Sequence, residues 1–242
     1  MGVNPKYGTD TLGVIAAAGK FNYWMYKTIA KHCSGEILEI GSGIGNISGF
    51  FITDNAPVSL SDFDNSYLPG LTDKYGKYPN FKGTYHLDLS DKSIELTHPE
   101  LIGKFDTVFA LNVVEHIPDH IQAIKNAHKL LRKNGKIIIL VPAFQTLFNQ
   151  FDIQLEHQRR YTKKSLKSLI SSNGFEVVHS QYFNFIGILG WFVSGKILRK
   201  KMIPEGQMKL YDTLVPLWKV VDFFTNQFAG LSVIQVGTKI EQ

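Results

Sequence analysis

Residues 37–46 read Ile-Leu-Glu-Ile-Gly-Ser-Gly-Ile-Gly-Asn, an apolar run that passes directly into a loop with glycine at every second position. Glycine permits positive φ and lets the backbone approach a ligand closely, and the N-terminus of a following helix presents unpaired amides. The stretch therefore predicts a nucleotide-type binding loop between a strand and a helix. A dinucleotide-binding loop is less well supported, because its fingerprint needs glycine where Asn46 stands. A P-loop is also less well supported, because no Gly-Lys-Ser/Thr follows.

Around this loop, short β-rich apolar runs alternate with helical patterns, which is typical of βαβ units in a parallel sheet covered on both faces. We predict seven strands, at Glu36–Ile40, Val58–Ser61, Gly83–His86, Phe105–Leu111, Lys136–Val141, Glu176–Phe183 and Ser232–Thr238. Helical spacing is clearest over Ile117–Arg132, where Asn134-Gly135 is expected to end the helix. A further helix is expected within residues 1–33, packed on the sheet by its aromatic residues.

The composition supports one soluble, reducing-compartment domain. The chain has 242 residues, of which 44% are hydrophobic, enough for a substantial core. Its single cysteine, Cys33, excludes an internal disulfide, and no Cys/His spacing suggests a metal site. The polar first ten residues do not resemble a signal peptide, so a cytoplasmic location is expected.

The net charge of +5 is concentrated in the second part of the chain. Residues 1–150 hold 14 basic and 14 acidic residues, whereas residues 151–242 hold 12 and 7. A solvated face explains this excess as well as an anionic partner does.

The Glu-x-Gly-x-Gly-x-Gly pattern of residues 39–45 resembles motif I of class I S-adenosylmethionine-dependent methyltransferases, and three later segments match that family in order. They are Ser-Asp-Phe-Asp at 61–64, His-Leu-Asp-Leu at 86–89, and Leu-Asn-Val-Val-Glu-His-Ile at 111–117. The resemblance covers roughly residues 20–145. It implies a Rossmann-like α/β fold: a seven-stranded, mostly parallel sheet with helices on both faces and strand seven antiparallel.

The resemblance also implies S-adenosyl-L-methionine as cofactor and a set of residues that bind it. Asp62 matches the acidic residue that binds the ribose hydroxyls, a task that suits a carboxylate because it accepts two hydrogen bonds from a vicinal diol. Asp88 matches the acidic site for the adenine amine. The full expected set is Glu39, Gly41, Ser42, Gly43, Gly45, Asp62, Phe63, Asp88, Leu89, Leu111 and Asn112.

Two histidines are candidates for a general base, which methyl transfer needs only if the acceptor must lose a proton. His116 follows the fourth strand, at the edge of the sheet where ligands bind. His157 lies in a His-x-Arg-Arg-Tyr stretch that resembles a bacterial subgroup of the family often associated with glycosyltransferases. Arg159, Arg160 and Tyr161 of that stretch are candidates for gripping an acceptor phosphate or carboxylate. The alternative for each is structural: surface pairing for the arginines and a helix cap for Tyr161.

The resemblance leaves the acceptor open. We expect O-methylation of a sugar-derived or lipid-linked small acceptor, with a quinone-type or other small-molecule methyltransferase, or a non-catalytic cofactor-binding module, as alternatives. The apolar and basic segment 183–201 is too short to span a membrane and suits either peripheral contact with the inner membrane face or a core helix or dimer contact. No Asn/Asp-Pro-Pro-Tyr/Phe tetrapeptide is present, which argues against a nucleic acid acceptor. The chain is expected to form one domain over 1–242, with a helical segment at 1–33 and an acceptor-side elaboration at 143–230; its oligomeric state is left open.

Overall fold

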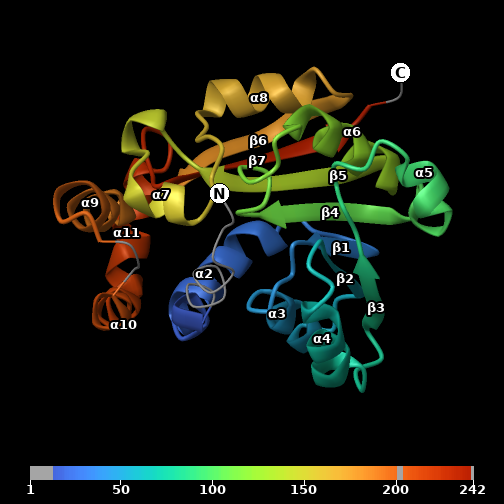
Figure 1. Ribbon diagram of the computed structural model, residues 1–242, viewed down its shortest axis with the longest axis horizontal. Coiled ribbons are helices and arrows are strands. Elements are labelled where there is room, and N and C mark those ends of the chain that lie inside the picture. The colour runs from blue at the N-terminus through green and yellow to red at the C-terminus, as the bar shows by residue number, and fades with distance from the viewer. Residues whose placement is uncertain (1–12, 201–203, 241–242) are drawn as a thin grey trace.

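The computed structural model describes residues 13–200 and 204–240 of the chain. Its centre is a seven-stranded sheet in the order β3-β2-β1-β4-β5-β7-β6 (Figure 1). The strands are β1 (Ile37–Ile40), β2 (Val58–Asp62), β3 (Phe81–His86), β4 (Phe105–Leu111), β5 (Leu131–Pro142), β6 (Phe175–Phe183) and β7 (Ser232–Lys239). Strand β7 is antiparallel to both β5 and β6, and the remaining pairs are parallel. The predicted fold class is confirmed.

Helices cover both faces of the sheet (Figure 1). One face carries α2 (Gly19–Ala30), α3 (Ser48–Thr53) and α4 (Tyr67–Tyr75), and the other carries α5 (Ile94–Thr97), α6 (His120–Leu130) and α8 (Lys163–Ser171). Each layer has its own apolar core against the sheet. Burying both faces explains why the central strands read as continuous apolar runs.

The expected amino-terminal helix is α2, which packs on the sheet through aromatic side chains. Trp24, Tyr26 and Ile29 are buried in the core beneath it. Trp24 contacts Phe183 at the end of β6, with ring centroids 4.4 Å apart.

Helix α6 is shorter than the sequence pattern predicts. It begins at His120 because Asp119 caps it, with the Asp119 carboxylate accepting from the Gln122 amide at 3.0 Å. It ends at Leu130, and Leu131 already belongs to β5. Asn134, at φ +60°, therefore lies inside β5, and the expected Asn134-Gly135 helix stop is wrong.

The segment between β5 and β7 adds helices at one end of the sheet, on the left of Figure 1. The added helices are η2 (Gln145–Leu147), α7 (Gln150–Gln154), α9 (Gly187–Trp191), the π-helical η3 (Phe192–Ile197), α10 (Glu205–Thr213) and α11 (Val215–Thr225). Elsewhere, the short 3₁₀ helix η1 (Pro99–Leu101) precedes β4. No helix within residues 13–200 and 204–240 is long and apolar enough to cross a membrane.

Candidate active site

The register of four parallel strands brings the predicted cofactor residues to one edge of the sheet. Ile40 pairs with Ser61 on β2 and with Ala110 on β4, and Asp62 pairs with His86 on β3. The next positions along β1, β2 and β4 are therefore Gly41, Asp62 and Leu111. Neighbouring strands lie about 4.8 Å apart, so these residues form a short row at the carboxyl ends, where ligands bind in open α/β sheets.

The glycine loop after β1 has the backbone that its sequence predicts. Gly41, Gly43 and Gly45 all have positive φ, at +69°, +51° and +81°. A Cβ atom on Gly41 would collide with the Val113 side chain, which follows β4. Glycine is therefore required at Gly41 both by the backbone angle and by the close approach of a neighbouring loop.

Glu39 lies beneath this loop rather than on its surface. Its side chain is buried, and the Ser48 hydroxyl at the start of α3 donates a hydrogen bond to Oε2. Burial raises the pKa of Glu39 to about 8. The contact fixes α3 to β1 across the loop, so Glu39 shapes the predicted cofactor site from below.

Asp62 holds the loop from the neighbouring strand. Its Oδ2 accepts from the Gly43 amide at 2.7 Å, and its Oδ1 accepts from the Asp64 amide at 2.9 Å. Burial raises the pKa of Asp62 above its usual range, although the backbone donors act in the opposite direction. A carboxylate has about four acceptor positions. Two are used here, so the group can also accept from a diol.

The residues beside Asp62 fit an adenosine. Phe63 is 69% exposed, an apolar ring open at the edge of the sheet next to the carboxylate. Asn112 is exposed after β4 at φ +55°, and Leu111 is half-buried. Ser42 is buried and joins β1 to β2, because its amide donates to the Ser61 carbonyl. Hydrogen-bond acceptors next to an apolar ring match the donor hydroxyls of a ribose and the flat apolar face of an adenine.

The two residues predicted after β3 differ in their surroundings. Asp88 is half-buried, and its Oδ1 accepts from both the amide and the hydroxyl of Ser90 at 2.7 Å. Leu89 is buried in the core, and its carbonyl accepts from Asn126 at 2.8 Å. Leu89 therefore supports the site from inside the fold.

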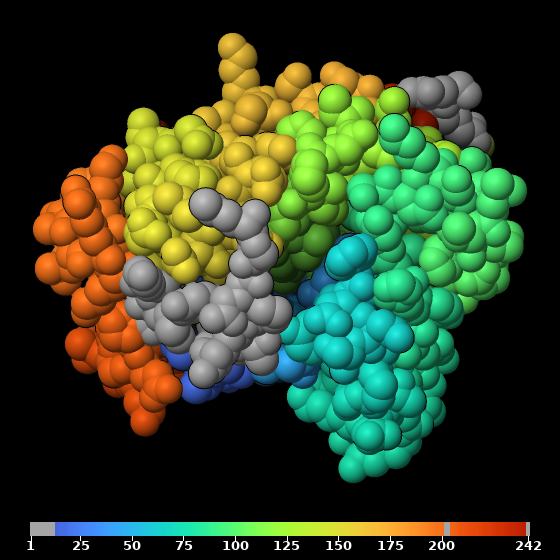
Figure 2. Space-filling view, viewed as in Figure 1, coloured from blue at the N-terminus to red at the C-terminus, as the bar shows by residue number. Residues whose placement is uncertain are grey.

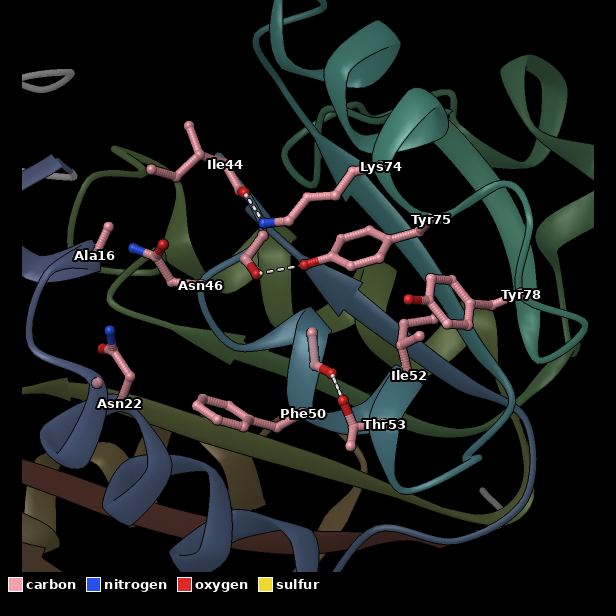
Figure 3. A pocket seen from close by; sticks show the side chains of 13 residues that line it. Ala16, Asn22, Ile44, Asn46, Phe50, Ile52, Thr53, Lys74, Tyr75 and Tyr78 are labelled. Atoms are coloured by element: carbon pink, nitrogen blue, oxygen red, sulfur yellow. Dashed lines mark hydrogen bonds between the residues drawn. The ribbon is translucent and has the colours of Figure 1, made fainter.

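A hollow of about 510 Å³ borders the glycine loop, between α2, α3 and α4 (Figure 3). Ile44, Gly45 and Asn46 line it, but Asp62, Phe63 and Asp88 do not. Its walls are tied together by Tyr75, whose hydroxyl donates to the Gly45 carbonyl at 2.9 Å. Of the predicted cofactor residues, only Gly45 lines this hollow.

The two candidate histidines meet next to this edge. Their rings are 4.8 Å apart in an edge-to-face arrangement. Burial, and then the neighbouring His157, lower the pKa of His116 to about 4, so its ring is neutral at pH 7. His157 is buried, with Nδ1 2.8 Å from Asp152 Oδ1. The sequence placed the two histidines in separate segments, and the fold brings their rings together; their part in catalysis stays a prediction.

Arg160 is engaged within the protein. It is 6% exposed, and its guanidinium donates to both Asp152 oxygens, at 2.8 and 3.1 Å, and to the Ala143 carbonyl. Its charge also lies 4.9 Å from the Trp191 ring centre. Burial would raise the pKa of Asp152, but His157 and Arg160 bring it below its usual range. Arg160 therefore has a structural role, and we do not propose it as a residue that binds the acceptor.

Arg159 and Tyr161 are also held by neighbours. Arg159 donates to the Ile117 and Pro118 carbonyls at 2.7 and 3.0 Å, and so supports the loop that carries His116. The buried Tyr161 hydroxyl lies 2.8 Å from His120 Nδ1, and burial raises the Tyr161 pKa to about 12. The cap of α8 is Thr162, not Tyr161.

Sequence reasoning missed Glu115 and Asp152. Glu115 is completely buried beside both histidines, and burial raises its pKa to about 8. The signal was a lone acid ending the apolar run Val113-Val114. No sequence motif marks Asp152, because its contacts with His157 and Arg160 form only when the chain folds back on itself after α7.

Comparison with known proteins gives the family of the chain. Residues 26–180, more than half of the chain, match the model of a methyltransferase domain. A probable S-adenosylmethionine-dependent methyltransferase of Mycolicibacterium smegmatis is 26% identical over 166 residues, covering 64% of this chain and 60% of that protein. The ubiquinone biosynthesis O-methyltransferase of Azotobacter vinelandii is 24% identical over 102 residues, or 42% of each. Both matches cover less than two thirds of the relative.

Among solved structures, phosphoethanolamine N-methyltransferase 2 of Haemonchus contortus, in complex with S-adenosyl-L-methionine, superposes with a TM-score of 0.63. The sequences are 17% identical, and the match covers 96% of this chain and 57% of that one. This likeness concerns the fold. The family match does not distinguish the glycosyltransferase-associated subgroup, which stays a prediction. On its sheet topology, its glycine loop and its domain match, the chain belongs to the methyltransferase domain family of class I S-adenosylmethionine-dependent methyltransferases.

Proposed function

We propose that this chain transfers the methyl group of S-adenosylmethionine to an oxygen atom of a small acceptor. The observation that carries the proposal is the row of Gly41, Asp62 and Leu111 at the carboxyl edge of the sheet, with the histidine pair adjacent. Bound S-adenosylmethionine supplies an electrophilic methyl group. The protein contributes the placement of the acceptor, which accounts for much of the rate in a displacement of this kind.

The residues of the chain have separate parts in this proposal. Asp62 binds the ribose, Phe63 and Asp88 lie along the adenine, and the loop at Gly41 approaches the methionine part. The acceptor oxygen lies beside His116 and His157. As the new C–O bond forms, the S–C bond breaks with its electrons remaining on sulfur, and the acceptor proton leaves toward solvent or a base.

The acceptor class that we favour is a sugar-derived or lipid-linked hydroxyl compound. The relatives include an O-methyltransferase that acts in ubiquinone biosynthesis, which supports oxygen as the methylated atom and keeps a quinone-type acceptor as the alternative. We further propose that residues 1–242 form a single domain and that residues 143–230 build its acceptor side.

A lipid-linked acceptor is supported by an exposed apolar surface on the added helices, which we term the apolar end. Figure 2 shows the orange atoms of α9 to α11 at the left margin of the molecule, and Figure 1 shows these helices beyond that end of the sheet. Exposed side chains there are Leu189, Val193, Ile197, Leu198, Leu210, Leu217, Val220, Phe223, Phe224 and Phe228. Exposed cations accompany them, at Lys196, Arg199, Lys200, Lys209 and Lys219. Apolar side chains with adjacent cations complement an anionic membrane surface, and we propose that the apolar end binds one.

Vesicle co-sedimentation tests this surface. We expect the protein to sediment with vesicles containing anionic lipid at low salt, and to be released at high salt or with neutral vesicles. Replacing Phe223 and Phe224 together by serine should weaken binding by at least about tenfold, because two aromatic side chains no longer enter the lipid. The control is Leu96→Ser, since Leu96 is 83% exposed on α5. Equal binding by both variants, or a concentration-dependent dimer in place of lipid binding, would reject the membrane proposal.

Calorimetry with S-adenosylhomocysteine tests the cofactor role of Asp62. The Asp62→Ala variant should bind about 1 to 3 kcal/mol more weakly, because the ribose hydroxyls and the Gly43 amide lose their acceptor. Asp73→Ala removes an equally charged but exposed side chain from α4 and should bind normally. NAD is the control ligand and should not bind. Unchanged affinity in a folded Asp62→Ala protein would show that the ribose lies elsewhere.

A further inference from the structure

Glu115 is a buried acid whose carboxyl group lacks a hydrogen-bond partner among residues 13–200 and 204–240. It is 0% exposed, and within those residues neither Oε1 nor Oε2 has a partner. Burying a carboxyl group without compensation is costly, and buried acids are normally paired or bound to metal. The nearby charge of Arg160 does not meet this need, since its donors go to Asp152 and Ala143. The position of Glu115 therefore requires another partner.

Two imidazoles face this carboxylate. Glu115, His116 and His157 each offer one ligand atom, and these atoms all lie within 4.8 Å of one another. His157 Nε2 is 3.9 Å from Glu115 Oε1, too far for a hydrogen bond. Donor atoms bound to one ion at about 2.0 to 2.2 Å lie roughly 3 to 4 Å apart, so small side-chain rotations would close the set around a cation.

The surrounding contacts orient His157 for metal binding. Asp152 Oδ1 lies 2.8 Å from His157 Nδ1, which directs Nε2 toward Glu115. A carboxylate that fixes the distal nitrogen is the usual partner of a metal-binding histidine. The Gln158 amide donates to the Glu115 carbonyl at 2.9 Å and joins the two segments of the cluster. Arg160 in turn holds Asp152. These contacts support the cluster on the His157 side, and none of those in the described part of the chain satisfies the Glu115 carboxyl group.

We propose that Glu115, His116 and His157 bind one divalent transition-metal ion, with Asp152 as the positioning residue of His157. Two imidazoles and one carboxylate favour Zn²⁺ and similar ions over Mg²⁺. Three protein ligands leave a coordination position open. Because the cluster follows β4, next to Asn112, that position adjoins the proposed methyl-transfer site, where it would take an acceptor oxygen. This last role rests on the proposed function, whereas the metal site itself does not.

Titration of the metal-free full chain with Co²⁺ tests the proposal, using calorimetry for stoichiometry and visible absorption for the ligand field. We expect one Co²⁺ per chain, displaced by Zn²⁺. Glu115→Gln retains the side-chain shape and should weaken Co²⁺ binding by at least about 10- to 100-fold, as should His116→Ala. His98→Ala, which removes a histidine outside the cluster, is the control and should bind normally.

Each outcome decides one claim. Saturable binding of one Co²⁺ that is lost in Glu115→Gln supports the site. No saturable binding to the folded wild-type chain, or equal binding by Glu115→Gln and the control, overturns it. S-adenosylhomocysteine affinity, measured on the same samples, should be normal in Glu115→Gln. If the wild-type chain binds Co²⁺ but not S-adenosylhomocysteine, the proposed function fails and the metal site stands. If it binds S-adenosylhomocysteine but not Co²⁺, only the metal site is rejected.

Discussion

The Arg160→Met variant should lose about 3 to 5 kcal/mol of unfolding free energy. Arg160 and Asp152 are both buried, and the substitution leaves the Asp152 carboxylate without its guanidinium partner. Breaking a buried ion pair on one side is costly because an uncompensated charge remains. Urea denaturation followed by circular dichroism measures the change.

Two further variants test whether Arg160 has a structural role or binds the acceptor. Arg159→Met removes the neighbouring guanidinium, whose donors go to two loop carbonyls, and should cost no more than about 1.5 kcal/mol. Adding Asp152→Asn to Arg160→Met should recover part of the loss, because the buried charge is removed with its partner. An Arg160→Met protein as stable as the wild type would mean that the pair does not hold this segment.

The Gly41→Ala variant should bind S-adenosylhomocysteine about 100-fold more weakly. Gly41 has φ +69°, and a Cβ atom there would meet Val113. Alanine would both strain the backbone and push the loop away from β4, and a shift of about 1 Å in a binding loop can have an effect of this size. Calorimetry on the folded variant gives the affinity.

Gly70→Ala is the matched control for this substitution. Gly70 lies in α4, and an added Cβ there would have nothing within 4 Å. The helix should be unchanged or slightly stabilised, with normal binding. Normal binding by Gly41→Ala as well would show that the loop does not approach the cofactor closely.

The sheet could be predicted from sequence because each strand carries a local signal. The apolar run ending at Gly41 and the run ending at Asp62 each contain both the strand and the point where it ends. Parallel strands bring their carboxyl ends to one edge, so the glycine loop and Asp62 could be placed together without knowledge of their contacts. Helix ends were harder to predict. The pair Asn134-Gly135 is typical of a helix stop, but both residues lie within β5.

The acceptor side was predicted less well because it depends on contacts between distant residues. The sequence Arg159-Arg160-Tyr161 suggests a charged, exposed group, but Asp152 draws Arg160 into the core and Tyr161 pairs with His120. Glu115 has no signal of its own beyond its position after a strand. The exposed face of α11 was also missed: Leu217, Val220 and Phe224 have ordinary helical spacing, and only the fold shows that more than half of each side chain stays uncovered by the described residues.

A crystal structure of the protein with bound S-adenosylhomocysteine tests the central claim most directly. The account predicts the ligand at the carboxyl edge of β1, β2 and β4, with its ribose hydroxyls on Asp62 and its adenine beside Phe63. Ligand density in the hollow between α2, α3 and α4, with no contact to Asp62, would contradict it.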